Sequence, residues 1–381
     1  MRKYPRILEK SIKKAFFSGK AIIIVGARQV GKTTMCERIV NSFKDENKKV
    51  IYFNGDNPTD RDFLNNKDFS FLDKLVGKND IVFIDEGQKI PTIGQTIKIL
   101  CDNYKNKKQI LVTGSSSFNL LNLSSEALTG RKIVFHLYPL SLPEIYQDNI
   151  LEMRKDLENI LTYGLYPNVV ASDTFVEKRN IINEIASSSL YADILEFQLV
   201  KNPSILTNLL KALALQIGSE VSYNELSNLL GIDRITVERY INLLEKNFVI
   251  FRIPPFFTNK RKEISKSKKI YFFDLGVRNS IINNFAPFDS RNDIGALWEN
   301  AMIIERMKKN EYDNKNINYY FWRTFTQTEV DLVEEINGKI DGFEFTWNPN
   351  KKKLPPTLWQ KYQNSSFNVI HSGNFEEFVG F

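Results

Sequence analysis

The stretch AIIIVGARQVGKTT, residues 21–34, decides how the first part of the chain folds. It opens with AIIIV, an apolar and mostly β-branched run with the length of a buried parallel strand. Residues 26–33 then spell the complete G-x-x-x-x-G-K-T pattern, and the following MCERIVNSF has helical spacing. A glycine-rich loop between a strand and a helix is the setting that this pattern requires. The stretch therefore predicts a phosphate-binding loop.

The residues of this loop suit a nucleoside triphosphate such as ATP. Glycines let the backbone curl so that its N–H groups wrap the phosphates, helped by the positive end of the following helix. Lys32 is expected to reach the β and γ phosphates and to act in catalysis, and the Thr33 hydroxyl is expected to ligate Mg²⁺. The predicted nucleotide contacts are Gly26, Ala27, Arg28, Gln29, Val30, Gly31, Lys32, Thr33 and Thr34.

A second apolar strand, in IVFIDEGQ (residues 81–88), ends in two acids. Asp85 is expected to hold Mg²⁺ through water, together with Thr33, and Glu86 is expected to polarise the attacking water as the catalytic base. This pair favours hydrolysis over a kinase reaction, because a kinase would present its phosphate acceptor at this place.

Two further polar positions are candidates. In QILVTGSSS (residues 109–117), Ser115 or Ser116 is expected to sense the γ-phosphate, unless the serines only form a polar turn after a strand. Arg131 follows Gly130 and precedes another strand. This arginine is expected to stabilise transition-state charge, within the chain or across a subunit contact. A surface ion pair is its alternative role.

These motifs, together with YPRIL near the start and LTGRKIVFHLYPLSLPEI, resemble a widespread prokaryotic family of AAA-type ATPases. That family carries a C-terminal region of poorly assigned function, and the resemblance covers nearly the whole chain. It implies a parallel sheet between helices, with ATP at the carboxyl ends of the strands. It also implies a helical lid after the nucleotide-binding core, where residues 144–201 have a helical pattern.

The next segment has the element order of a winged helix-turn-helix, which the family resemblance also implies. Ser222 and Glu225 predict a capping box at the start of a short helix that stops at Gly231. Asp233 then caps a second helix and precedes the β-rich FVIFRI. The side chains of the second helix expected to pack inward are Ile235, Tyr240, Ile241 and Leu244.

This segment also supplies the predicted nucleic-acid contacts. They are Arg234 and Arg239 on the second helix, and Lys260, Arg261 and Lys262 in the basic stretch NKRKEISKSKK (residues 259–269). Basic side chains there can grip phosphates, and we favour DNA as the partner. A protein partner is the alternative, because winged helices also serve as protein-contact modules and lysine-rich hairpin tips are often only solvated.

The C-terminal region is similar to the skeleton of restriction-endonuclease-like folds, in which a helical Glu, a strand Asp and a Glu-x-Lys hold Mg²⁺. By this resemblance Glu299, Asp331 and Glu344 form a second metal site. Thr346 stands where the pattern has lysine, and residues 351–353 lie too far along the chain to replace it unless the chain turns back. We therefore expect a nuclease fold that is inert or very weakly active. This expectation includes the case in which the acids only lie on a solvated face of the sheet.

The composition is that of a globular, mildly basic protein. The 381 residues hold 52 Lys and Arg against 45 Asp and Glu, a net charge of +7, which is compatible with a polyanionic partner. Cys36, Cys101, His136 and His371 are the only residues of their kinds. Their scarcity argues against disulfides, an ordinary zinc site and histidine acid–base chemistry. No apolar run approaches a membrane span, and we expect a cytoplasmic protein.

We predict an α/β protein with a parallel-sheet P-loop NTPase core of the AAA type, a helical lid, a winged helix-turn-helix and an α/β restriction-endonuclease-like domain. The predicted boundaries are 1–143, 144–203, 204–285 and 286–381. The expected activity is Mg²⁺-dependent ATP hydrolysis coupled to nucleic-acid binding. The alternatives are a nucleotide-gated switch with a protein partner and an ATP-licensed nuclease. An oligomer is compatible with all three.

Overall fold

The computed structural model describes residues 4–115, 128–195, 202–257, 267–324, 328–351, 353–362 and 364–381. These residues form two compact units. Residues 5–139 with 246–248 make up one unit, which is called the nucleotide-binding unit after its predicted phosphate loop. Residue 4 and the remaining residues from 140 to 381 make up the C-terminal unit.

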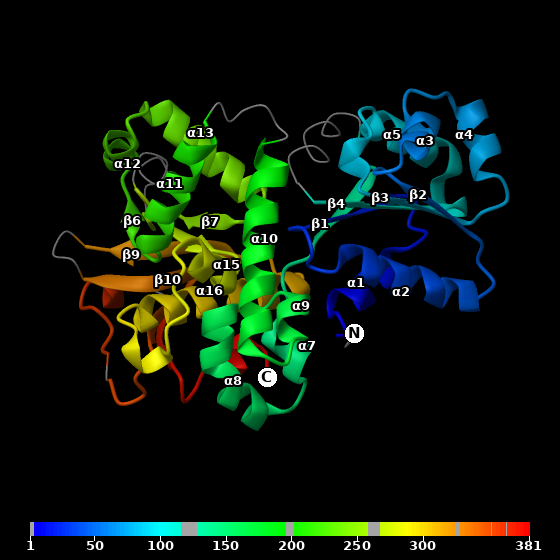
Figure 1. The fold of residues 1–381 in the computed structure, drawn as a ribbon. Helices are drawn as coiled ribbons and strands as arrows, with labels where there is room; N and C mark the ends of the chain where they lie inside the picture. Colours follow the sequence, from blue (N-terminus) through cyan, green and yellow to red (C-terminus); the bar gives the residue numbers. More distant parts are fainter. Residues whose placement is uncertain are drawn as a thin grey trace. The chain divides into compact units, whose positions relative to one another are not determined.

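The nucleotide-binding unit is built on a five-stranded parallel sheet (Figure 1). Its strands run in the order β5-β1-β4-β3-β2, and all four pairings are parallel. The strands are β1 (Ala21–Val25), β2 (Val50–Asn54), β3 (Ile81–Asp85), β4 (Gln109–Gly114) and β5 (Lys132–His136). Strands β1 and β3 are buried along their whole length, as a continuous apolar run predicts for a strand with both faces covered.

Helices cover both faces of this sheet (Figure 1). On one face lie α1 (Leu8–Ala15) and α2 (Lys32–Asp45), and on the other α3 (Pro58–Leu64), α4 (Phe69–Val76) and α5 (Ile93–Tyr104). Because the strands are parallel, their carboxyl ends share one edge of the sheet. The predicted parallel sheet between helices is confirmed.

The C-terminal unit begins with four helices. They are α7 (Leu142–Tyr146), α8 (Ile150–Tyr163), α9 (Pro167–Val170) and α10 (Phe175–Leu195). Within this unit α8 and α10 pack against α15 (Leu275–Ile281). The predicted helical character of this segment is therefore present, whereas its role as a lid stays a prediction.

Three helices and a small antiparallel sheet follow. The helices are α11 (Pro203–Leu215), α12 (Tyr223–Leu230) and α13 (Arg234–Lys246), and the strands β6 (Glu220–Val221), β7 (Ile250–Ile253) and β8 (Lys268–Phe272) pair in the order β6-β8-β7. The Ser222 side chain accepts a hydrogen bond from the Glu225 N–H at 3.3 Å, and α12 ends at Gly231 with a φ of +64°. Asp233 accepts from the Thr236 N–H at 2.8 Å, so both predicted helix starts are found.

One prediction for α13 is wrong. Tyr240, Ile241 and Leu244 are buried as expected, but Ile235 is 79% exposed. The buried stripe of α13 begins at Val237 and continues three, four and seven residues later. Ile235 precedes that stripe by two residues, which places its side chain about 200° around the helix and away from the core.

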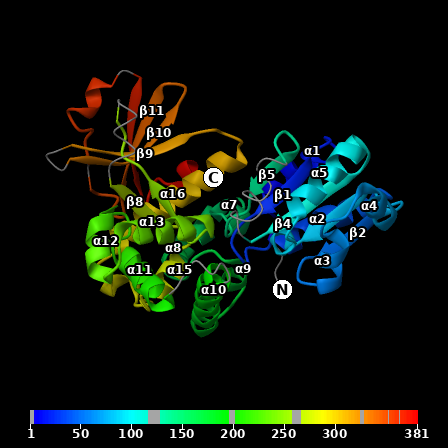
Figure 2. The same ribbon diagram turned by 90° about the horizontal axis from the view of Figure 1, so that it is seen from above.

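The last part of the unit is a four-stranded sheet in the order β12-β11-β10-β9 (Figure 2). Its strands are β9 (Asn318–Arg323), β10 (Glu329–Ile336), β11 (Lys339–Thr346) and β12 (Ser365–His371), of which β11 and β12 are parallel and the others antiparallel. Helix α16 (Ile294–Tyr312) packs against β11, and α17 (Glu376–Val379) packs on α16. Within the described ranges, no helix has the length and apolarity needed to cross a membrane.

Candidate functional site

The predicted phosphate loop joins the carboxyl end of β1 to the amino end of α2. Gly31 is the residue before α2 and has a φ of +92°, and Gln29 also has a positive φ of +61°. Glycine tolerates this left-handed conformation without the steric cost that a side chain brings. At Gly26 the need for glycine is a matter of space, because a Cβ there would lie 2.1 Å from the Leu137 carbonyl oxygen.

Lys32 is buried at the start of α2, with 5% of its surface exposed. Its ammonium group donates hydrogen bonds to the carbonyl oxygens of Gly26 at 3.0 Å and Ala27 at 2.7 Å. The side chain thus reaches back across the loop that it follows. A cation held at this place, beside the glycine-rich loop, is suited to attract phosphate oxygens.

Asp85 ends β3 beside this loop and is surrounded by hydroxyl groups. The Thr33 hydroxyl donates to its carboxylate at 2.9 Å, the Tyr52 hydroxyl lies 3.3 Å away, and the Thr113 hydroxyl also donates to it. Burial, together with the negative charge of Asp85, raises the pKa of Tyr52 to about 12, so Tyr52 stays a hydrogen-bond donor. Thr33 and Asp85 are therefore in contact, as the prediction of a shared Mg²⁺ requires.

Glu86 is held in an unusual conformation next to Asp85. Its φ is +50°, a region that costs about 1–3 kcal/mol for a residue with a side chain. The Glu86 N–H donates to the Thr113 hydroxyl at 3.2 Å. The Gln88 side-chain amide donates to the Glu86 carboxylate at 2.5 Å and to the Ser115 hydroxyl at 2.8 Å. Glu86, the predicted base, and Ser115 thus both accept a hydrogen bond from the side-chain amide of Gln88.

The side chains of the other predicted nucleotide contacts differ in how exposed they are. The Val30 side chain is fully buried in the core, so only its backbone can face a nucleotide. Arg28 is half-buried, and Thr34 is exposed in the first turn of α2. Their contacts with a nucleotide stay predictions, as does the sensing role of Ser115.

Four residues at this edge were missed from the sequence: Thr113, Gln88, Tyr52 and Arg6. Thr113 lies at the end of β4, the strand beside β3, so its place after an apolar run was a usable signal. Gln88 stands two residues after Glu86. Arg6 lies in the YPRIL stretch that carries part of the family resemblance, so that stretch was a usable signal. No local pattern points to Tyr52, which reaches the site from a distant part of the sequence.

Arg131 does not lie at this edge. Its carbonyl oxygen accepts from the N–H of Ala21, the first residue of β1, at 2.8 Å. It therefore lies at the amino ends of the strands, roughly 13 Å of strand away from the phosphate loop. The Arg131 guanidinium instead pairs with Asp102. The predicted role within the chain is thus corrected to the ion pair, whereas a role across a subunit contact stays a prediction.

The acids of the predicted second metal site converge on a lysine. The buried Lys269 of β8 places its ammonium 3.1 Å from Glu299, 3.7 Å from Asp331 and 3.8 Å from Glu329. The Tyr271 hydroxyl donates to Glu299 at 2.6 Å. Burial lowers the pKa of Lys269, but the carboxylates outweigh this and raise it. Burial and Asp331 raise the pKa of Glu299 to about 7, against the opposing effect of Lys269.

Glu344 has a lysine partner of its own. The chain turns back after β11 and brings the Lys353 ammonium into an ion pair with Glu344. The expectation that residues 351–353 are too distant to replace the lysine missing at Thr346 is therefore wrong for Lys353. Burial, followed by the charge of Asp331, raises the pKa of Glu344 to about 7.

The predicted second metal site is not assembled in this structure. Across the residues that the structure describes, no group of three or more His, Cys, Asp or Glu side chains is arranged to hold a metal ion. The physical reason is the pair of ammonium groups, which already supply positive charge to Glu299, Asp331 and Glu344.

Of the predicted nucleic-acid contacts, Arg234 and Arg239 are exposed on α13. Lys260, Arg261 and Lys262, like Ser116, lie outside the described residues. The exposed start of α13 also carries Glu238, and Asp233 precedes it. Two cations and two anions thus balance on this surface.

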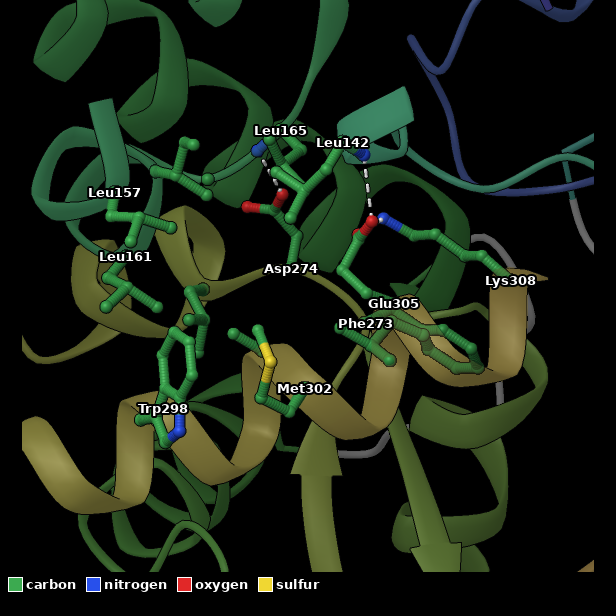
Figure 3. Close-up of a pocket in the computed structure, with 15 residues that line it drawn as sticks. Leu142, Leu157, Leu161, Leu165, Phe273, Asp274, Trp298, Met302, Glu305 and Lys308 are labelled. Atoms are coloured by element: carbon green, nitrogen blue, oxygen red, sulfur yellow. Dashed lines mark hydrogen bonds and ion pairs between the residues drawn. The ribbon is translucent and has the colours of Figure 1, made fainter. Parts of the chain in front are cut away.

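A separate cavity lies inside the C-terminal unit, mainly between α8 and α16 (Figure 3). It encloses about 20 Å³, room for about one water molecule. The carboxylates that line the cavity already accept hydrogen bonds from other groups of the protein. Asp274 accepts from the Leu165 N–H at 2.7 Å, and Glu305 accepts from the Leu142 N–H at 2.8 Å and from Lys308 at 2.6 Å. We interpret this cavity as part of the core.

Comparison with known proteins divides the chain into three matched segments. Residues 18–146 match an AAA domain family, and residues 154–287 and 294–375 match two domains of unknown function, DUF8612 and DUF4143. An uncharacterized protein of Mycobacterium tuberculosis is 26% identical over 338 residues, which are 87% of this chain and 71% of that protein. An uncharacterized protein of Methanocaldococcus jannaschii is 26% identical over 355 residues, 87% of this chain and 76% of its own.

Solved structures also show similarity at low identity. The replication initiator DnaA bound to AMPPCP and single-stranded DNA is 17% identical, covers 64% of this chain and 89% of its own, and has a TM-score of 0.29. Cdc6p from Pyrobaculum aerophilum is 13% identical, covers 74% of this chain and 95% of its own, and has a TM-score of 0.33. The family match and the five-stranded parallel sheet with its phosphate loop identify residues 18–146 as a P-loop AAA domain.

Proposed function

We propose that the chain binds ATP together with Mg²⁺ and hydrolyses the ATP. The observation that carries the proposal is the meeting of Lys32, Thr33, Asp85 and Glu86 at one edge of the parallel sheet, with Thr33 and Asp85 2.9 Å apart. Four chemically complementary groups from two strand ends are the arrangement that phosphoryl transfer needs.

Each group has a distinct role in this proposal. The loop amides wrap the phosphates, and the Lys32 ammonium exchanges the carbonyl oxygens of Gly26 and Ala27 for phosphate oxygens. The donor set fits Mg²⁺, because hydroxyl and carboxylate oxygens are its preferred protein ligands. Thr33 and Asp85 would hold the ion, which neutralises charge on the phosphates. Glu86, oriented by Gln88, accepts a proton from the attacking water.

Two variants test this proposal. Lys32→Ala should lose ATP binding, measured with a fluorescent ATP analogue, while Lys44→Ala, an exposed lysine on the same α2, should bind normally. Glu86→Gln should bind ATP but turn it over much more slowly. Unchanged affinity in Lys32→Ala would overturn the binding proposal, and normal turnover in Glu86→Gln would remove Glu86 as the base.

We further propose that ATP turnover is coupled to a macromolecule held by the C-terminal unit. The support for nucleic acid is the exposed Arg234 and Arg239 on α13, the second helix of a helix-turn-helix. The unassembled metal site disfavours the alternative of an ATP-licensed nuclease.

A protein partner is the second candidate, and a specific observation favours it. Ile235 on α13 and Leu229 on α12 are 79% and 66% exposed. Exposed apolar side chains beside a charge-balanced helix end suit a protein surface better than a phosphate backbone. In this case the chain is a nucleotide-gated switch.

One experiment separates the two partners. Binding of duplex DNA is measured by fluorescence anisotropy at two salt concentrations, with ATP present. DNA binding that weakens steeply with salt, and that falls in an Arg234→Glu/Arg239→Glu variant but not in Ile235→Ser, supports nucleic acid. If the protein does not bind DNA at low salt, or if the charge reversal leaves DNA binding unchanged, the result supports a protein partner.

A further inference from the structure

The segment before α1 reaches the phosphate loop through one side chain. Arg6 is buried, with 6% of its surface exposed. Its guanidinium donates to the carbonyl oxygen of Val30 at 2.8 Å and to that of Tyr138 at 2.6 Å. Val30 lies in the phosphate loop, and Tyr138 follows β5. Arg6 therefore ties the loop to the end of the neighbouring strand.

The bond to Val30 has a consequence for the next amide. A peptide unit is planar and trans, so its carbonyl and its N–H point in opposite directions. Because the Val30 carbonyl points toward Arg6, the N–H of Gly31 points to the opposite side of the loop. The Arg6 Nη1 atom also lies 3.9 Å from the place where a Cβ of Gly31 would be. The guanidinium thus rests against the loop itself.

Helix α1 keeps Arg6 in register with α2. Leu8 and Ile12 of α1 are buried, and Glu9 forms an ion pair with Arg38 of α2. Helix α2 starts at Lys32, so the same packing that fixes Arg6 fixes the predicted phosphate-binding lysine. A guanidinium stays protonated at any physiological pH. Arg6 therefore brings a permanent, buried positive charge to the back of the loop.

We propose that Arg6 is a positioning residue for the triphosphate. It holds the Val30–Gly31 peptide with its N–H turned into the loop before any nucleotide arrives, and it adds positive charge behind the phosphates. This inference rests on the proposed ATP binding and concerns the phosphates alone. Arg6 should therefore act equally on any triphosphate, whatever base it carries.

The test compares Arg6→Ala and Arg6→Lys with wild type and with Arg38→Ala, which removes the α1–α2 ion pair but leaves the bonds to the loop. Titration calorimetry with inorganic tripolyphosphate and with ATP, each with Mg²⁺, gives the dissociation constants. Loss of a buried charged hydrogen bond predicts that Arg6→Ala weakens both ligands by about 10- to 100-fold. Arg6→Lys keeps the charge but loses the two-pronged donor, so its affinity should fall between wild type and Arg6→Ala.

Amide hydrogen exchange is a second measurement, and it distinguishes a local effect on the phosphate loop from a general destabilisation of the protein. Amides of residues 28–32 should exchange faster in both Arg6 variants than in Arg38→Ala, while amides of β3 stay unchanged. Wild-type affinity for tripolyphosphate in Arg6→Ala, or in Arg6→Lys if Arg6→Ala does not fold, would overturn the inference. If wild type itself binds neither ligand, the proposed function fails; if only the Lys32→Ala variant loses binding, the inference about Arg6 fails alone.

Discussion

Replacing Lys269 by methionine should destabilise the C-terminal unit by about 3–5 kcal/mol at pH 8, the usual effect of removing one partner from a buried ion pair. The Lys269 side chain is 3% exposed, and its ammonium lies within 4 Å of Glu299, Asp331 and Glu329. At an effective dielectric constant of about 20, the 3.1 Å contact with Glu299 alone corresponds to about 5 kcal/mol of attraction. Desolvation of the ammonium offsets part of this. Methionine fills a similar volume but removes the positive charge from beside Glu299 and Asp331.

The loss of stability should depend on pH in a defined direction. The pKa of Glu299 is raised from 4.5 to about 7 in the folded protein, so the folded state holds this proton more tightly than the unfolded state. Protonation therefore stabilises the fold as the pH falls through about 7, and this contribution is complete below about 4.5. Without Lys269 the acids repel more strongly and gain more from a proton. The deficit of Lys269→Met at pH 5 should be less than half of that at pH 8.

Tryptophan fluorescence in urea is a suitable assay for this region. The four tryptophans of the chain, at positions 298, 322, 347 and 359, all lie in the C-terminal segment that contains α16 and the four-stranded sheet. The control is Lys339→Met, which removes an ion pair between Lys339 and Asp341 on the four-stranded sheet. The Lys339 side chain is 63% exposed. Exposed pairs contribute less than about 1 kcal/mol.

Either of two results would contradict the stabilising role of the Lys269 charge. One is a Lys269→Met deficit no larger than that of Lys339→Met. The other is a deficit that is the same at pH 5 and pH 8, because it would show that packing and not charge is responsible. The double variant Lys269→Met/Glu299→Gln should recover part of the stability lost at pH 8, since it removes one of the uncompensated acids.

Two further predictions concern the nucleotide-binding unit. Thr113→Val removes the hydroxyl that donates to Asp85 and accepts from the Glu86 N–H. In a steady-state assay, kcat for ATP hydrolysis should fall by about 10- to 100-fold, with little change in ATP affinity. Equal losses in kcat and affinity would contradict this role. Gly26→Ala should destabilise the unit by about 1–3 kcal/mol in thermal unfolding, because its Cβ meets a backbone oxygen at 2.1 Å that cannot move aside cheaply. The control is Gly295→Ala, whose Cβ would lie in open space, and equal Tm shifts in the two variants would argue against the clash.

Much of the phosphate site could be predicted because its signals are local. The strand, the loop and the lysine of residues 21–34 are adjacent in sequence, and the glycines of the loop allow the left-handed backbone conformation that it needs. Asp85 and Glu86 follow a second apolar run, and parallel strands bring such ends to one edge. The same locality explains why the caps at Ser222 and Asp233 were found.

Predictions failed where the decisive neighbour is distant in sequence. Arg131 adjoins a strand in the sequence, but the register of β5 against β1 sets it at the edge of the sheet away from the phosphate loop. The carboxylates Glu299 and Glu344 have lysine partners that come from elsewhere in the chain, Lys269 from β8 and Lys353 through a turn. Neither lysine lies at a fixed short spacing from its acid.

The phosphate loop and the parallel sheet follow from the sequence alone, because both depend on short-range conformational preferences and on apolar runs. The surroundings of the charged groups follow from the tertiary fold. Arg6 is 24 residues from the loop carbonyl that it binds, and Lys269 is 30 residues from Glu299. Charge and hydrogen-bond interactions act through space over a few ångströms, so their partners follow from the packing of the elements and not from the order of the residues.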